Sequence, residues 1–178
     1  MRLKSITVAA IVALTFMLSS AVCFGQNRGP STPEERAQAL RIARALEANP
    51  LDEKAKKARE WLLYWLIEVP DIHINLCTGF LEPLYGKKDK NYSSEIVGQM
   101  MFSTAAFIIE HPDKEKDDEA TYQAGLEGSL RAYESILKTK PNARWPFLDD
   151  LIARREKGEL GAYVQDILKQ GKCKPGRN

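Results

Sequence analysis

The stretch SSEIVGQMMFSTAAFIIE, residues 93–110, decides the fold of this 178-residue chain. Apolar side chains lie on nearly every side of the helix that it would form, namely Ile96, Val97, Met100, Met101, Ala105, Phe107, Ile108 and Ile109. A helix that is hydrophobic all round is normally enclosed by other helices. Ser93 or Ser94 can cap its first turn, and Pro112 ends it after His111. We therefore expect a central helix, with the rest of the chain packed around it.

Two further helices are predicted before this stretch. Residues 32–35 (TPEE) form a capping box with proline at the first helical position, so a helix should begin there and run to about Ala48. Asp52 can cap a second helix, in which apolar residues recur at three- and four-residue spacing. The end of that helix, residues 61–67 (WLLYWLI), is apolar on every side and should therefore also be enclosed.

Three more helices are predicted after the central stretch. A long amphipathic helix ends before Pro141, a second closes at Gly158, and a third ends at Gly171. Residues 72–76 (IHINL) alternate with period two, but no partner strand is evident, so we interpret them as irregular or briefly helical. The fold class is therefore all-α, a single-domain bundle of about six to seven helices in antiparallel hairpins. It covers residues 32–173, and a polar tail follows at 174–178.

Two stretches resemble the second helix of the tetratricopeptide repeat with its terminal proline. They are ALRIARALEANP, residues 39–50, and AYESILKTKP, residues 132–141. The repeat's period of roughly 34 residues and the tryptophan and glycine signature of its first helix are missing. The resemblance implies helical hairpins. The chain also resembles small secreted all-helical proteins of bacteria, and this second resemblance implies no activity.

The first 25 residues have the pattern of a secretory signal peptide. Arg2 and Lys4 provide a basic start, and residues 6–18 form an apolar run that is too short to be a comfortable membrane span. The protein is therefore expected to be exported and to be periplasmic or extracellular.

Cleavage of the signal peptide is expected after Gly25. Cys23 and Gly25 supply the small side chains that the peptidase needs at the third and first positions before the scissile bond. Residues 26–31 would then form a flexible mature N-terminus. Lipid attachment to Cys23 is the alternative, but it asks for a small residue before the cysteine, and Val22 is β-branched. We therefore expect no stable membrane anchor.

Removal of this peptide changes the charge and the cysteine content. Without Arg2 and Lys4, the 26 basic residues fall to 24 and equal the 24 acidic residues, so no net positive charge favours binding to nucleic acid. Only Cys77 and Cys173 remain after the loss of Cys23. An even number of cysteines in an oxidising compartment predicts a disulfide between these two.

Motifs for metal, cofactor and catalysis are missing from the sequence. It contains no CxxC, GxSxG, HExxH or glycine-rich phosphate loop, so we expect no cofactor and no metal. Asp113, Glu115, Asp117 and Glu119 alternate as the ligands of a calcium loop do. The EF-hand pattern fails at its glycine and at its final glutamate, so a solvated loop before a helix is the better interpretation.

Two classes of function stay open. The first is a non-catalytic exported helical module that binds a protein or a small apolar ligand in a groove between helices. The side chains that could line the groove are Trp61, Tyr64, Trp65, Met100, Met101 and Phe102, although aromatic and methionine residues at helical spacing more often belong to the core. The alternative is a carboxylate-dependent enzyme with a site near Glu110 and His111, which could share a proton. The first class needs an exposed apolar groove, whereas the second needs titratable groups that converge in one pocket.

Overall fold

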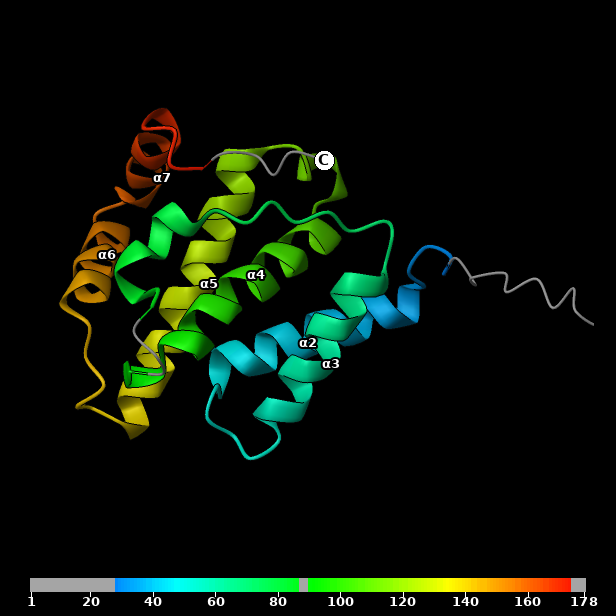
Figure 1. The fold of residues 1–178 in the computed structure, drawn as a ribbon, viewed down its shortest axis with the longest axis horizontal. Helices are drawn as coiled ribbons and strands as arrows, with labels where there is room; N and C mark the ends of the chain where they lie inside the picture. Colours follow the sequence, from blue (N-terminus) through cyan, green and yellow to red (C-terminus); the bar gives the residue numbers. More distant parts are fainter. Residues whose placement is uncertain (1–27, 87–89, 174–178) are drawn as a thin grey trace, which may run out of the picture.

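The computed structural model describes residues 28–86 and 90–173, so the predicted signal peptide, its cleavage after Gly25 and the polar tail lie outside the described residues. The described residues form one helical domain without β-strands, which confirms the predicted all-α class (Figure 1). Its α-helices are α2 (Pro33–Ala48), α3 (Ala55–Glu68), α4 (Ser93–Glu110), α5 (Asp118–Thr139), α6 (Pro146–Glu156) and α7 (Leu160–Lys169). Short 3₁₀ helices occupy Thr78–Leu84, Lys90–Tyr92 and Pro112–Lys114.

Helix α4 lies at the centre of the domain, as the sequence predicts. In Figure 1, α4 and α5 cross the middle, with α2 and α3 on one side and α6 and α7 on the other. Ile96 and Met100 of α4 join a core cluster with α5, α6, α7 and the 3₁₀ helix Thr78–Leu84. Phe102 and Ile108 of the same helix join a second cluster with α2 and α3. Both parts of the core therefore depend on α4.

The predicted capping box of α2 is confirmed. The Thr32 hydroxyl accepts a hydrogen bond from the Glu35 backbone N–H at 3.2 Å, and the Glu35 carboxyl accepts one from the Thr32 N–H at 2.9 Å. This reciprocal pair satisfies two amides that have no partner inside the helix. The helix ends at Ala48, where the sequence places its end.

The predicted cap of α3 is wrong by two residues. The N-cap position belongs to Lys54, and the Asp52 side chain accepts a hydrogen bond from the Lys54 N–H at 2.8 Å. Backbone bonds from Asp52 N to Asn49 O and from Ala55 N to Asp52 O form tight turns before the helix. A cap at Asp52 would have placed residues 53 and 54 in the helix, but these residues belong to the turns.

The start of α4 also differs from its prediction, because Tyr92 occupies the N-cap position that we assigned to Ser93 or Ser94. Asn91 and Tyr92 have positive φ values of 48° and 61°. Asn91 is fixed there by the connection between α5 and α6, where its side chain donates to Arg144 O at 3.0 Å and its carbonyl accepts from Trp145 Nε1 at 3.1 Å. A tertiary contact thus sets this helix start.

Residues 72–76 are irregular, as we interpreted them. Side chains at the start of α5 and in the connection before it hold this segment in place. The His73 N–H donates to the Glu115 carboxyl at 3.1 Å, and Asn75 donates to the Asp118 carboxyl at 3.2 Å. Asp117, in the same acidic series, accepts from the Ala120 N–H at 3.1 Å and caps α5.

The end of α7 is joined to the middle of the chain by the predicted disulfide. Cys77 and Cys173 are bonded, with 4.9 Å between their Cα atoms, and Cys77 is buried. Gly79 lies against the same end, because a Cβ on it would be 2.8 Å from Lys172 Cβ. Residues after α7 therefore pack directly on the 3₁₀ helix Thr78–Leu84.

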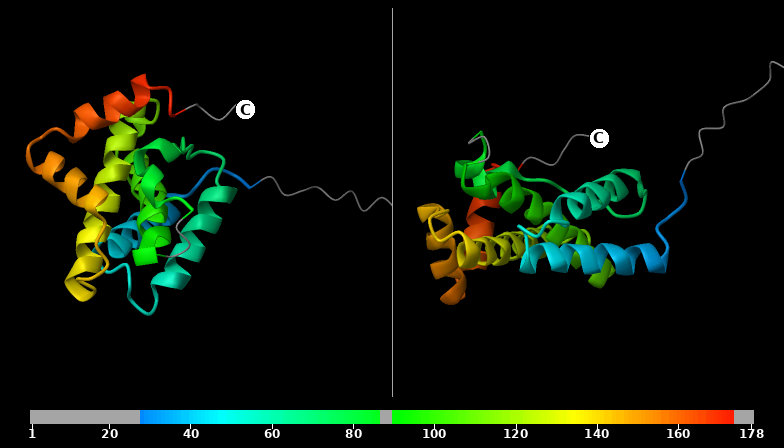
Figure 2. Two further views of the ribbon diagram at one scale, coloured as in Figure 1. Left: turned by 60° about the vertical axis from the view of Figure 1, so that its left-hand side comes forward. Right: turned by 90° about the horizontal axis from the view of Figure 1, so that it is seen from below.

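The expected enclosure of residues 61–67 is wrong. Leu62 and Trp65 are buried, but Leu63, Tyr64 and Ile67 are 42%, 70% and 72% exposed. Helix α3 lies at an edge of the domain in both views of Figure 2 and packs against α2. It has no helix on its other side among the described residues, so Leu63, Tyr64 and Ile67 face solvent.

Candidate functional site

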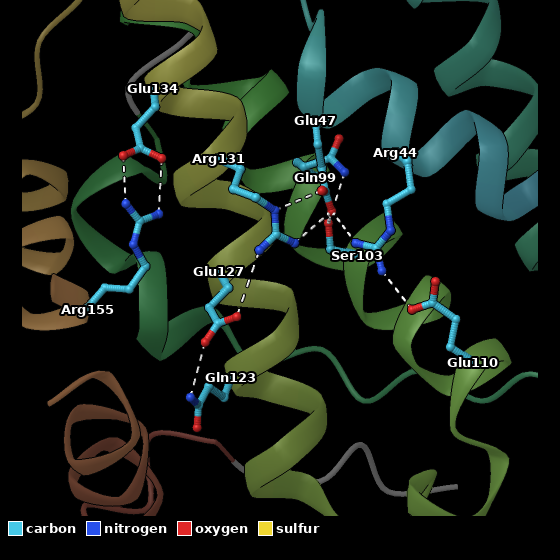
Figure 3. Close-up of polar contacts among 10 residues, drawn as sticks. All are labelled: Arg44, Glu47, Gln99, Ser103, Glu110, Gln123, Glu127, Arg131, Glu134 and Arg155. Carbon is cyan, nitrogen blue, oxygen red and sulfur yellow. Dashed lines mark hydrogen bonds and ion pairs between the residues drawn. The ribbon is translucent and has the colours of Figure 1, made fainter. Parts of the chain in front are cut away.

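A buried carboxylate lies where α2, α4 and α5 meet (Figure 3). Glu47 accepts hydrogen bonds from Ser103 Oγ at 2.7 Å, Arg44 Nη1 at 2.9 Å, and Arg131 Nε and Nη2 at 2.8 and 3.1 Å. Burial by itself would raise the pKa of Glu47. Hydrogen bonds from Arg131 and Ser103, with the charges of Arg131 and Arg44, outweigh burial and lower this pKa. Glu47 is therefore a fixed anion at neutral pH.

Each charged group around Glu47 has a partner of opposite charge within the protein. Arg44 Nη2 also donates to Glu110 at 2.7 Å, and Arg131 Nη1 lies 3.8 Å from the Glu127 carboxyl. Each guanidinium therefore lies between two carboxylates, as Figure 3 shows. Because every charged member of the cluster contacts a group of opposite charge, the cluster joins α2, α4 and α5.

Glu110 and His111, the predicted enzyme site, line a groove of about 480 Å³ beside this cluster. The groove also contains Lys114 and Glu127, so titratable groups do converge there. Glu110 is held by Arg44, however, and the His111 ring lies 4.7 Å from the ring of Phe107. Among the described contacts, none is a hydrogen bond between Glu110 and His111.

A second groove, of about 640 Å³, runs beside α3. It lies between α3, the start of α2 and the segment that precedes α2. Its aromatic side chains are Trp61, Tyr64 and Trp65, and its carboxylates are Glu35, Glu60 and Glu68. The rings of Trp61 and Trp65 are stacked, with centroids 6.1 Å apart and planes within 9° of parallel. The exposed apolar face of α3 continues from this groove.

The six aromatic and methionine side chains that we considered for a groove or for the core divide between the two. Trp61, Tyr64 and Trp65 line the groove beside α3, and Trp65 is also buried in the core. The other three belong to the interior: Met100 and Phe102 are buried in the core, and Met101 is partly buried against it. The core interpretation therefore holds for most of the set, and only Trp61 and Tyr64 belong to the groove without being core residues.

Asp71 holds the segment before α2, which forms one wall of this groove. Its carboxylate accepts hydrogen bonds from the Ser31 N–H and hydroxyl, both at 2.8 Å, and from Arg36 Nη2 at 2.6 Å. Burial opposes ionisation, but these hydrogen bonds and the Arg36 charge lower the pKa of Asp71 to about 2. The contacts tie Ser31, part of the segment predicted to be flexible, to the residues that follow α3.

Replacing Asp71 by asparagine should destabilise the protein in a pH-dependent way. The folded pKa is about 2 and the ordinary value is 3.8, so the contribution of Asp71 is complete above pH 3.8 and is lost as the pH falls toward 2. At pH 6 we expect Asp71→Asn to lower the free energy of unfolding by about 1–2 kcal/mol, after allowance for solvent screening. Urea unfolding at pH 6 and pH 2.5 measures the difference.

Asp150→Asn is the matched control for this measurement. Asp150 pairs with Arg154 on an exposed part of α6, so its removal should change the stability by less than about 0.5 kcal/mol at either pH. A loss for Asp71→Asn that persists unchanged at pH 2.5 would contradict the role given to the ionised carboxylate.

No protein-family model, curated protein or solved structure matches the chain. The resemblance of residues 39–50 and 132–141 to a tetratricopeptide helix therefore stays a prediction; these stretches end α2 and α5. The described residues contain no group of three or more His, Cys, Asp or Glu that could hold a metal ion. No described helix has the length and apolar content needed to cross a membrane.

Proposed function

We propose that the protein is an exported, non-catalytic module that binds a protein partner through the outer face of α3. The observation that carries this proposal is the exposure of Leu63, Tyr64 and Ile67 on one side of α3. Contiguous exposed apolar side chains mark interaction surfaces, and tyrosine and tryptophan contribute strongly to binding energy there. Trp61, in the adjoining groove, extends this face.

The shape of the groove supports a protein partner in preference to a small apolar ligand. Pockets for small molecules surround most of the ligand surface. The groove beside α3 is open to solvent, and the exposed side chains of Leu63 and Ile67 lie outside its lining. A chain that packs along α3 would cover both the groove and these side chains, whereas a small molecule in the groove would leave them exposed.

The enzyme alternative near Glu110 and His111 has less support. A general base must reach the proton that it abstracts, and a useful pair of groups must be free to exchange one. The Glu110 carboxylate is already paired with Arg44, and His111 packs on Phe107. The first contact holds the C-terminal end of α4 against α2 and the second lies within that end, so both have a structural role.

Selection of peptides from a displayed library against the mature protein tests the proposed surface. We expect enriched peptides that carry bulky apolar side chains. Their affinity should fall at least tenfold, or about 1.4 kcal/mol, in the double variant Tyr64→Ser/Ile67→Ser. Both side chains are largely exposed, so this variant should keep the helical circular dichroism and unfolding midpoint of the parent.

Leu76→Ser is the matched control, because Leu76 is 63% exposed but does not line the α3 groove. Its binding to the selected peptides should be unchanged. Failure to enrich any peptide, or equal binding to the double variant and the parent, would overturn the assignment of α3 as the recognition surface.

A further inference from the structure

We propose that the groove beside α3 receives a guanidinium or ammonium group of the partner chain, in the place where Arg28 now lies. This inference rests on the proposed function and specifies the chemistry of the partner. Arg28 would then act as an occupant from the protein's own chain, which the partner displaces.

The position of Arg28 shows that the groove accommodates a cation. Its Nη2 donates to the Glu35 carboxyl, and its Nη1 lies 3.9 Å from the Glu68 carboxyl. The two carboxylates come from α2 and α3, whereas Arg28 belongs to the segment that precedes α2. The groove thus holds a guanidinium between two helices, and that guanidinium is not carried by either helix.

The lining of the groove favours a cation after Arg28 is removed. Without Arg28, the groove contains the carboxylates of Glu35, Glu60 and Glu68 and a single positive side chain, Lys57. Aromatic rings also attract cations through the negative charge on their faces, and tryptophan does so most strongly. Carboxylates and aromatic rings around one space therefore select an organic cation over an anion or a purely apolar group.

The groove itself is held more firmly than its occupant. Glu35 is fixed by its hydrogen bond from the Thr32 N–H, and Trp65 is only 5% exposed. The Thr32 bond is also the largest cause that lowers the pKa of Glu35, with burial opposing it and Arg28 adding to it. Arg28 makes one close contact and one at 3.9 Å. Exchange of Arg28 for another cation would leave the carboxylates in place.

Trp65 also helps to keep the groove anionic. Its Nε1 is buried and lies near enough to the Glu35 carboxyl to contribute to the lowered pKa of that group. Glu35 is therefore ionised and can pair with a cation that replaces Arg28.

Titration with acetyl-arginine-methylamide, followed by the indole N–H signals of Trp61 and Trp65 in ¹H–¹⁵N NMR spectra, tests the inference. In Arg28→Ala, the probe should shift these signals saturably, with a dissociation constant at least tenfold lower than in the parent protein. In Arg28→Ala/Glu68→Gln the dissociation constant should rise again at least threefold. Trp145, whose indole donates to Asn91 O at 3.1 Å, is the internal reference and should not shift.

Acetyl-citrulline-methylamide, which has nearly the same shape without the charge, is the matched control probe and should not bind. Equal binding of the two probes, or equal arginine binding by the parent and Arg28→Ala, would overturn the inference. The displayed-peptide selection keeps the two proposals apart. Peptides that need Tyr64 and Ile67 but show no preference for arginine or lysine would refute the cation site alone, whereas absence of such peptides would refute the recognition surface.

Discussion

Removal of the Cys77–Cys173 disulfide should lower the free energy of unfolding by about 4 kcal/mol. The bond joins residues 96 positions apart. For a loop of this length, the chain-entropy model gives about 4–5 kcal/mol, from which residual structure in the unfolded chain subtracts. Domains of this size have a total stability of about 5–15 kcal/mol, so the loss is a large fraction of the whole.

Helix α7 should respond first to this loss. Its buried residues Leu160, Val164 and Ile167 pack on the larger core cluster, and its C-terminal end is held by the bond to Cys77. Without the bond, that end can fray, because a chain terminus that is not tied down is the least stable part of a fold. Amide hydrogen exchange should therefore accelerate more in α7 than in α4.

Denaturant unfolding of the parent protein, with and without a reducing agent, measures the effect. The variant Cys77→Ser/Cys173→Ser controls for the reagent and should match the reduced parent to within the small change caused by burying a serine at position 77. An unfolding midpoint that does not change on reduction would show that the bond contributes nothing to stability. Two free thiols in the exported protein would show that the bond does not form.

Gly128→Ala should destabilise the protein by about 2–3 kcal/mol, because it overfills the contact between α4 and α5. A Cβ at this position would be 1.9 Å from Ser103 Oγ, 2.3 Å from Ser103 Cβ and 2.9 Å from Glu47 Oε1. Ser103 cannot turn away without breaking its hydrogen bond to the buried Glu47 carboxylate. The helices must therefore separate or the Glu47 cluster must be disrupted.

Helix propensity acts in the opposite direction and reduces the net destabilisation that Gly128→Ala should cause. Alanine is more favourable than glycine inside a helix by about 1 kcal/mol, so the steric penalty must exceed this gain. Gly98→Ala isolates the gain, because the nearest side-chain atom to a Cβ at Gly98 is Phe102 Cε2 at 3.9 Å. We expect Gly98→Ala to stabilise the protein by about 0.5–1 kcal/mol.

Denaturant unfolding of the two glycine variants should therefore give changes of opposite sign. A stabilising Gly128→Ala would mean that α4 and α5 are not as close as the structure places them. A destabilising Gly98→Ala would mean that the space around Gly98 is smaller than the structure shows, and the comparison would then no longer isolate the contact of Gly128 with Ser103.

The Glu47 cluster is an example of a feature with only a weak signal in the sequence. Glu47 follows Ala39 and Ala43 at four-residue spacing, on the side of α2 that is buried. This spacing could have marked it as a buried carboxylate. Its partner Arg131 is 84 positions away, however, and only the packing of α5 on α2 brings the two together.

The candidate enzyme pair shows why neighbours in sequence need not act together. Glu110 is the last residue of α4, and its carboxylate pairs with Arg44 on α2. His111 is the C-cap residue, with non-helical φ and ψ of −134° and 68°, and its ring packs on Phe107. Their adjacency in the sequence made them a candidate, and the end of the helix between them separates their contacts.

The sequence by itself determined the all-α class, the central position of α4, both boundaries of α2 and the ends of α6 and α7, because these depend on local chemistry. A capping box starts α2, and Gly158 and Gly171, with φ of 73° and 65°, close α6 and α7 in the left-handed conformation that glycine adopts readily. Only the tertiary structure decided the start of α4, the pairing around Glu47 and the exposed face of α3. An apolar helix surface has the same sequence pattern whether another helix covers it or not, so its exposure depends on where the rest of the chain packs.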